Sequence, residues 1–185
     1  MKQEALNIHQ EIIDRCREGD AQAQHDLYRL YSKSMINTAF RICGNQEDAE
    51  DALQESFVNA FKHLKTYRGD ATFGAWLKRI VVNKSLTIVK KSSSESIMLQ
   101  AYGENNDWAN DSKEELDNYS VEVIRNAIMN LPPGFRSVIT LYLFEGYDHE
   151  EIGQILGVAE STSKTQYKRA KDKLRMILNE QLKYG

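Results

Sequence analysis

The densest group of cationic side chains lies near the C-terminal end of the sequence. Six lysines and arginines stand between Lys164 and Arg175, opposed only by Asp172, in a chain whose net charge is -3. A helical pattern precedes them, and Gly157 separates the two segments, as in a helix-turn-helix. Because this motif places its second helix in the major groove of DNA, we expect a duplex-binding helix here.

Residue spacing divides the second helix of this motif into a buried side and an exposed side. Small and apolar residues recur at intervals of three and four and form one buried stripe: Ser163, Tyr167, Ala170 and Leu174. The polar residues between them then point outward, where they can contact phosphates or base edges: Ser161, Lys164, Thr165, Lys168 and Arg169. At the start of the first helix, Asp148 is expected to act as the cap.

A second charged segment, residues 45–57, contains five acids and no base. Three of the acids recur at spacings of three and four, on one side of a helix beside Gln54: Asp48, Asp51 and Glu55. Most charge runs are solvated surface, and acids in a first helical turn also suit the helix dipole. The other interpretation is a face that docks a basic, preformed protein surface.

From Lys62 to Lys91 the charge balance reverses. Eight cations are opposed by Asp70 alone, and aromatic residues are interleaved with them. Cations beside exposed aromatic rings are typical of surfaces that bind single-stranded nucleic acid. Helical spacing favours core positions for Phe73 and Trp76, so Tyr67, in a turn, is the better candidate for stacking on a base.

The chain as a whole is predicted to be all-α, because apolar residues recur at three and four throughout and strand-like alternation is nearly absent. Apolar stripes within residues 27–40, 49–64 and 73–81 predict three helices that close a small bundle, and Asn45 is placed to cap the second. Residues 92–118 break the pattern and hold seven acids against one lysine. We therefore expect two small helical domains joined by a flexible acidic linker.

Several classes of protein are disfavoured by the composition. Cys16 and Cys43 lack metal-ligand spacing, and the four histidines do not cluster around them, so buried thiols are expected and no metal. No phosphate loop or nucleophile-base motif is visible, which favours a protein that is not an enzyme and needs no cofactor. The apolar runs are too short to cross a bilayer and the N-terminus has no signal-peptide pattern, so we expect a cytoplasmic protein.

Three segments resemble conserved regions two and four of the extracytoplasmic-function (ECF) sigma factors of the sigma-70 family: DAEDALQESFVNAFKHL, YRGDATFGAWLKRIVVN and LPPGFRSVITLYLFEGYDHEEIGQILGVAESTSKTQYKRAKDKL. The likeness covers both domains in order, from about Ala21 to Leu178, and the wording of residues 162–166 is similar to the Bacteroidetes branch. It implies an N-terminal helical lead at 1–20, sigma region 2 at 21–91, the acidic linker at 92–118 and sigma region 4, a helix-turn-helix, at 119–182.

The resemblance implies an alternative sigma factor, which binds core RNA polymerase and directs promoter-specific transcription initiation. The beta-prime clamp coiled coil would be bound by Asp48, Asp51, Gln54 and Glu55, and the beta flap is a second implied contact. The minus-ten element would be melted and read by Tyr67, Lys78, Arg79, Asn83, Lys84, Lys90 and Lys91, with a flipped base held at Asn83. The minus-thirty-five element would be read as duplex by Ser161, Thr162, Lys164, Thr165, Gln166, Lys168 and Arg169. Promoter DNA is thus an implied partner, and an anti-sigma factor is a candidate partner.

The sequence departs from the family pattern at a few positions. Thr87 and Lys90 replace an Asp and an Arg that many members carry near the minus-ten site. Ala159 stands where a serine often caps the reading helix, and Ser161 replaces a glycine. We therefore expect Ser161 or Thr162 to act as the cap and the helix to begin slightly later.

The main alternative is an autonomous helix-turn-helix transcriptional regulator with a helical dimerisation or sensing domain. Such a protein would need a dimer surface and an effector pocket. It would leave the acidic helix and the basic third helix without a role. Binding to core RNA polymerase separates the two hypotheses.

Overall fold

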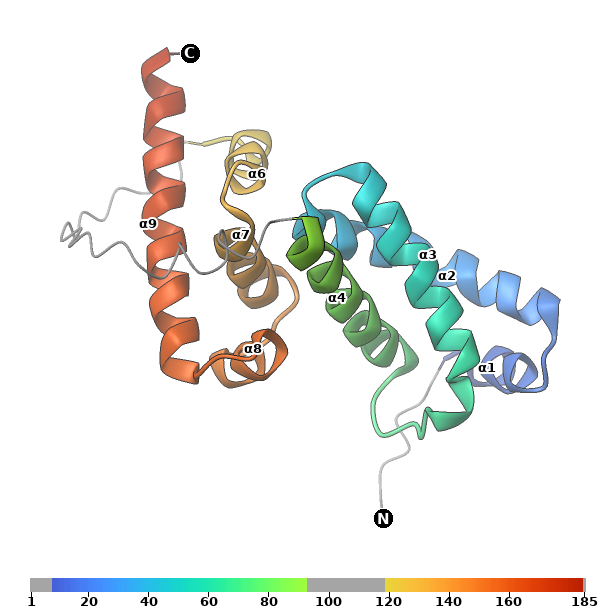
Figure 1. The fold of residues 1–185 in the computed structure, drawn as a ribbon. Coiled ribbons are helices and arrows are strands. Elements are labelled where there is room, and N and C mark those ends of the chain that lie inside the picture. The colour runs from blue at the N-terminus through green and yellow to red at the C-terminus, as the bar shows by residue number, and fades with distance from the viewer. Residues whose placement is uncertain (1–7, 93–118, 185) are drawn as a thin grey trace. The chain divides into compact units, whose positions relative to one another are not determined.

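The computed structural model describes residues 8–92 and 119–184, and the regular elements within these two ranges are helices (Figure 1). They form two compact units, Met1–Val89 and Lys90–Gly185. The all-helical prediction with two domains is therefore confirmed. Of the predicted linker, residues 92–118, only Ser92 is described, as the last residue of helix α4 (Phe73–Ser92), and residues 93–118 lie outside the described residues.

The N-terminal unit is a helical bundle in which α2 and α3 pack along each other (Figure 1). Its elements are α1 (Gln10–Arg17), α2 (Ala21–Cys43), α3 (Gln46–Lys62), the short 3-10 helix η1 (Leu64–Thr66) and α4 (Phe73–Ser92). Gly44 joins α2 to α3 with φ 86, a left-handed conformation that glycine adopts without a steric penalty. Asn45 caps α3 as predicted, since its side chain accepts a hydrogen bond of 2.8 Å from the backbone of Asp48.

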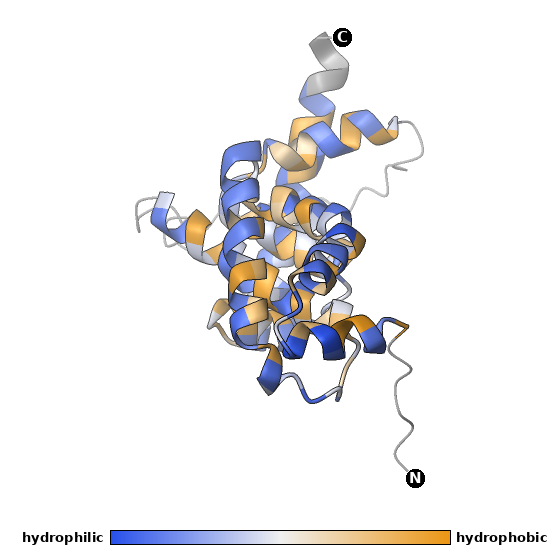
Figure 2. Ribbon diagram, turned by 90° about the vertical axis from the view of Figure 1, so that its right-hand side faces the viewer, coloured by the Kyte–Doolittle hydropathy of each residue, from blue (hydrophilic) through white to orange (hydrophobic). Residues whose placement is uncertain are grey.

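Small side chains make up much of the buried side of α3, beside Leu53 and Phe57. Ala49, Ala52 and Ala60 are fully buried, as is the hydroxyl-bearing Ser56. Larger apolar residues from the other helices complete the core of this unit: Ile13, Leu27, Ile42, Phe73, Leu77, Val81 and Val82. Polar residues cover the outer sides of the same helices, so apolar and polar colours alternate around them (Figure 2).

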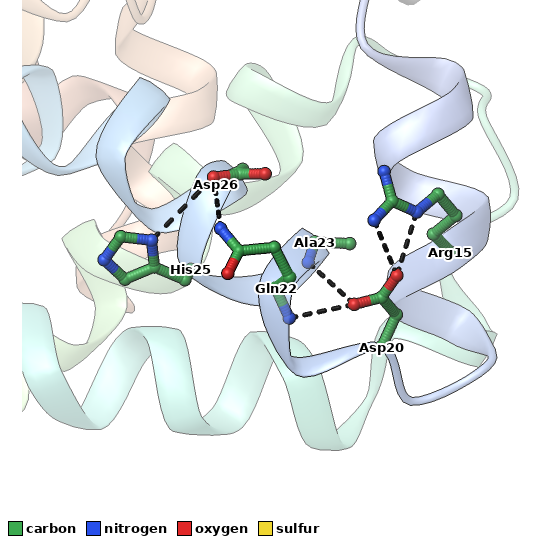
Figure 3. A network of polar contacts seen from close by, with 6 residues as sticks. All are labelled: Arg15, Asp20, Gln22, Ala23, His25 and Asp26. Atoms are coloured by element: carbon green, nitrogen blue, oxygen red, sulfur yellow. Dashed lines mark hydrogen bonds and ion pairs between the residues drawn. The ribbon is translucent and has the colours of Figure 1, made fainter.

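Asp20 caps α2 and also binds α1, a contact that sequence analysis did not predict (Figure 3). One carboxylate oxygen accepts hydrogen bonds from the backbone N–H of Gln22 at 2.8 Å and of Ala23 at 3.1 Å. The other oxygen lies 2.7 Å from Nη2 of Arg15. These hydrogen bonds, first the one from Ala23 and then the one from Arg15, lower the pKa of the Asp20 carboxyl.

The C-terminal unit is built around one long helix. Its elements are α6 (Val121–Met129), α7 (Pro133–Ile139), the π-helical turn η3 (Thr140–Phe144), α8 (His149–Leu156) and α9 (Glu160–Tyr184). Helices α6, α7 and α8 all pack against α9. The core between α6, α7 and α9 consists of Ala127, Ile128, Leu131, Ile139, Ala170, Leu174 and Leu178.

A buried arginine donates hydrogen bonds to backbone carbonyl groups at the end of α6. Arg136 is only 7% exposed, and its Nη1 donates to the carbonyl oxygens of Met129 and Leu131, each at 3.2 Å. These carbonyls lie at the end of α6, where the helix itself offers no further donors. The charge is therefore buried together with hydrogen-bond acceptors, as a buried cation requires.

The turn between α8 and α9 requires glycine at two positions. Gly157 has φ 75, and its N–H donates to the carbonyl of Gly153 at 2.8 Å. A Cβ atom on Gly153 would lie 2.8 Å from the carbonyl oxygen of Val158, closer than real Cβ contacts come. The two helices of the motif can thus approach each other only because residue 153 has no side chain.

The sequence predicted how each of the two helices of the helix-turn-helix begins. Asp148 caps α8 as predicted, in a reciprocal capping box with Glu151. The expected late start of α9 is wrong: the helix begins at Glu160, and the carbonyl of Ala159 already accepts the helical hydrogen bond from Ser163 at 3.0 Å. The backbone therefore takes the helical path without a capping side chain at residue 159.

Cys16 and Cys43 are buried free thiols, in agreement with the sequence prediction. Burial raises the pKa of the Cys16 thiol to about 11, so that this group remains protonated at neutral pH. In the part of the chain that the structure describes, no helix has the length and apolar character needed to cross a membrane.

Asp20→Asn should change how the stability of the N-terminal unit depends on pH. Asparagine keeps a cap oxygen but loses the charge. Because the folded-state pKa of Asp20 is lowered, its stabilisation is present above the ordinary carboxyl pKa of about 4 and is lost as pH falls through the lower folded-state value. In urea unfolding between pH 3 and 7, the free energy of unfolding of the wild type should exceed that of the variant most at neutral pH. A constant difference would contradict this, and Glu18→Gln controls for the loss of one exposed negative charge.

Gly153→Ala should destabilise the C-terminal unit by about 1–3 kcal/mol, because the added methyl meets the backbone at Val158 and Glu160. Gly134→Ala is the matched control, since a Cβ there has nothing within 4 Å. Thermal unfolding followed by circular dichroism measures both variants. Equal stability of the two alanine variants would show that the close approach at Gly153 is relaxed in solution.

Candidate nucleic-acid interface

The acidic side of α3 is exposed. Asp51, Gln54 and Glu55 all face solvent, whereas Asp48 is half-buried and accepts a hydrogen bond of 2.7 Å from Nδ2 of Asn45. Three of the four predicted residues thus share an open surface. Asp48 stands at its edge and also belongs to the cap of α3.

An apolar residue that the sequence analysis missed lies within this acidic surface. Val58 is 68% exposed, and it follows Asp51 and Glu55 at spacings of seven and three, which places it on the same side of α3. The helical spacing could have revealed it. We call Asp51, Gln54, Glu55 and Val58 the α3 face.

The cations of α4 do not all lie together. Arg79, Asn83 and Lys90 are exposed and recur, with Thr87, at spacings of three and four along one side of the helix. The hydroxyl of Thr87 donates to the carbonyl of Asn83 at 2.8 Å. We call these four residues the α4 face.

Lys78 and Lys84 stand apart from the α4 face. Lys78 is half-buried and lies one position before Arg79, a rotation of about 100° around the helix. Lys84 is also half-buried, and its ammonium forms an ion pair with the carboxylate of Glu55 on α3. Lys91, at the end of α4, is exposed next to Lys90. The structure therefore groups only part of the predicted minus-ten set.

The prediction that Tyr67 offers an exposed ring is wrong. The residue is only 5% exposed, and its ring packs against Phe73 and Trp76, with ring centroids 5.7 and 5.2 Å away. Its hydroxyl donates to the carbonyl of Ala71 at 2.6 Å, and its own carbonyl accepts from Nη2 of Arg17 at 2.7 Å. Tyr67 is thus held in the core and cannot stack on a base in this structure.

Four of the five residues predicted to point outward from α9 are exposed. Ser163 and Ala170 are fully buried, whereas Ser161, Lys164, Thr165 and Lys168 are exposed. The ammonium of Lys164 lies 2.7 Å from Oε1 of Glu160, and this hydrogen bond raises the pKa of Lys164. Lys164 therefore keeps its positive charge on the exposed side of the helix.

Three other predicted reading residues are less accessible. Gln166, which the resemblance implies as a reading residue, is only 8% exposed, so its side chain is not accessible to DNA in this structure. Its spacing explains the burial: it lies three residues after Ser163 and four before Ala170, within the buried stripe. Thr162 and Arg169 are half-buried at the margins of the exposed side.

Lys171 extends the exposed cations of α9 and was not among the predicted site residues. It follows Lys164 and Lys168 at spacings of seven and three, so the three ammonium groups lie along one side of the helix. Its Nζ stands 4.9 Å from the ring centroid of Tyr167, a cation-π contact. We call Lys164, Lys168 and Lys171 the α9 face.

Within residues 8–92 and 119–184, no group of three or more histidine, cysteine or acidic residues is arranged to hold a metal ion. The candidate surfaces in the two units are thus helical faces defined by charge and exposure.

Comparison with known proteins identifies both units. The model of Sigma-70 region 2 matches residues 27–95, and that of Sigma-70 region 4 matches residues 122–174. Together the two models match more than half of the chain, and their order along it is that of the two structural units. The chain belongs to the sigma-70 family, within its ECF group. Members of this family are DNA-binding transcription initiation factors.

Relatives from distant bacteria share this organisation. The ECF RNA polymerase sigma factor SigE of Mycolicibacterium smegmatis is 34% identical over 83% of the chain, which spans 60% of that relative's length. SigW of Bacillus subtilis, also an ECF RNA polymerase sigma factor, is 26% identical over 91% of the chain and 95% of its own length.

Two solved structures share the fold. CnrH, in complex with the cytosolic domain of CnrY, has a TM-score of 0.54 at 21% identity, covering 91% of this chain and 95% of its own. The sigma factor RpoE of Bartonella quintana, in complex with the anti-sigma factor NepR, has a TM-score of 0.57 at 20% identity, covering 84% of this chain and 96% of its own.

Proposed function

We propose that this chain is an alternative sigma factor that binds core RNA polymerase and directs it to a specific set of promoters. The observation that carries the proposal is the division of charge between two separate helical units. One unit presents an acidic α3 face and a polar-basic α4 face, and the other presents the cations of the α9 face. A factor that must bind both a protein and DNA needs both kinds of surface.

The α3 face is the proposed contact with the beta-prime clamp coiled coil. Its carboxylates, with Asp48 at the edge, offer charge complementary to a basic helix surface, and the exposed Val58 offers apolar area for contact. Surface charges raise the rate of association more than they raise the affinity. The apolar contact area of Val58 would therefore help to hold the complex after the charges have brought the two proteins together. The beta flap is a second proposed contact of the polymerase, made by the C-terminal unit.

The α4 face is the proposed minus-ten site. Asn83 offers both a hydrogen-bond donor and an acceptor for the edge of an unstacked base, while Arg79, Lys90 and Lys91 supply charge for the backbone. Lys84 would first have to leave its ion pair with Glu55, whose side chain is exposed, and ion pairs at the surface contribute only about 0–1 kcal/mol.

The outward side of α9 is the proposed minus-thirty-five site. Ser161, Thr165 and the lysines of the α9 face would contact the duplex directly, and Arg169 would contact it from the margin. Lysine and arginine bind both phosphates and guanine edges, so this set can position the helix as well as read sequence.

Two finer assignments complete the proposal. An anti-sigma factor is proposed as a regulatory partner, supported by the likeness in fold to RpoE, whose solved structure contains one. The sequence TSKTQ at residues 162–166 supports a Bacteroidetes-type member.

The decisive experiment is reconstitution of the purified chain with core RNA polymerase. We expect the two to copurify at moderate salt and to give run-off transcripts from a limited set of promoters in the source genome. An autonomous regulator would instead bind a duplex operator as a dimer without polymerase. Failure to bind core polymerase would refute the proposed function.

Asp51→Lys should weaken binding to core polymerase and leave the fold intact, because Asp51 is an exposed member of the α3 face. Glu50→Lys is the matched control: it makes the same change in net charge one residue away, about 100° around the helix. Competition for core polymerase measures both variants, and circular dichroism checks the fold. If both reversals weaken binding equally, general charge rather than the α3 face would account for the affinity.

Lys168→Ala should cost about 1–3 kcal/mol at one base pair of the minus-thirty-five element and relax specificity there. Lys173→Ala removes the same charge from the other side of α9 and serves as the control. Holoenzyme binding to duplexes with single base-pair changes gives both values. A uniform loss over all duplexes, with a smaller salt dependence, would show that Lys168 contacts phosphate instead.

A further inference from the structure

Three aromatic rings connect the parts of the helix-turn-helix behind the α9 face. The ring of His149, at the first position of α8, stacks on Tyr142 of η3 with centroids 4.6 Å apart and planes at 16°. Both rings also contact Tyr167 of α9, at centroid distances of 5.5 and 4.5 Å. One histidine thus touches both the element before the motif and its second helix.

His149 also makes a directional contact with α9. Its Nδ1 lies 3.0 Å from the hydroxyl oxygen of Ser163, which is fully buried. Ser163 is the residue immediately before Lys164, and Tyr167 is the residue immediately before Lys168. His149 therefore contacts the two residues that immediately precede the first two cations of the α9 face.

A directional contact at this place can fix how α9 is rotated about its own axis. Apolar packing against α9 is non-directional, so it resists separation of the helices more than small rotations. A hydrogen bond, by contrast, is directional: its angle prefers to exceed about 150°, and the bond weakens steeply below about 120°. With side-chain ends about 6 Å from the helix axis, a rotation of about 10° moves them by about 1 Å, enough to spoil a bidentate base contact.

We propose that His149 is a positioning residue for promoter recognition, which sets the rotation of α9 through its hydrogen bond to Ser163. The inference rests on the proposed function, because it concerns how the same duplex-reading surface is held. His149 itself does not contact DNA in this proposal. Its role is to hold the α9 face in the one orientation in which its cations meet a given set of base edges.

Two substitutions at residue 149 separate the hydrogen bond from the ring. His149→Phe keeps a ring for the stack on Tyr142 but has no nitrogen for Ser163. His149→Asn removes the ring but places an amide near the position of Nδ1, where it can still bond the hydroxyl. The double variant His149→Phe with Ser163→Ala removes both partners, so that no buried hydroxyl is left without a bond.

The probe is a duplex library randomised over the minus-thirty-five region, selected with reconstituted holoenzyme. Wild type and His149→Asn should enrich the same motif. His149→Phe should lose about tenfold or more in discrimination between that motif and single-base variants. In the double variant, the urea midpoint should return toward the wild-type value while discrimination stays lost, since the orienting bond is still absent.

Other results would overturn the inference. If His149→Phe discriminates as well as wild type, the hydrogen bond does not set the reading geometry. If the double variant recovers both stability and discrimination, the contact with Ser163 is purely structural. A wild-type holoenzyme that forms but selects no motif would refute the proposed reading function, and the inference with it, whereas selectivity lost only in the variants concerns His149 alone.

Discussion

The close backbone approach at Gly153 is the constraint on which the C-terminal unit depends. The chain must turn from α8 into α9 within a few residues, and the carbonyl of Val158 occupies the space that a Cβ on residue 153 would need. Gly153 in turn accepts the hydrogen bonds that close the turn, from Gly157 and Val158. The distance between α8 and α9 is therefore set by backbone atoms. The rotation of α9 about its own axis is left to side-chain contacts such as the proposed one of His149.

Ion pairs at the surface contribute little to the stability of either unit, whereas the buried Arg136 bonds carbonyl groups at the end of α6. Both cores are formed by aliphatic, alanine and aromatic side chains, and the ion pairs Arg15–Asp20, Glu55–Lys84 and Lys164–Glu160 lie at the surface. Such pairs typically contribute about 0–1 kcal/mol each. The charge pattern of α3, α4 and α9 is thus free to vary with the partner, while the fold is kept by other residues. This separation is consistent with a fold shared at about 20% sequence identity.

Local signals in the sequence predicted local structure well. The caps at Asn45 and Asp148 and the turn at Gly157 were recognisable, because each depends on residues only a few positions apart. Tyr67 was mispredicted because its burial depends on Arg17, fifty residues away, and on rings from α4. Gln166 entered the reading set through the family resemblance, although its spacing places it in the buried stripe. Spacing also could not reveal the Glu55–Lys84 pair, since it says which side of a helix is exposed but not what faces it.

The alanines of α3 have a consequence for its opposite side. Ala49, Ala52 and Ala60 have no exposed area, so at these positions α3 approaches its neighbours as closely as a methyl side chain allows, while Leu53 and Phe57 are buried beside them. Any larger residue there would push the whole helix outward, because close-packed neighbours yield little. Asp51 and Glu55 would move with it. The position of the acidic surface therefore depends in part on three methyl groups on the far side of the helix, at residues that are buried away from any partner.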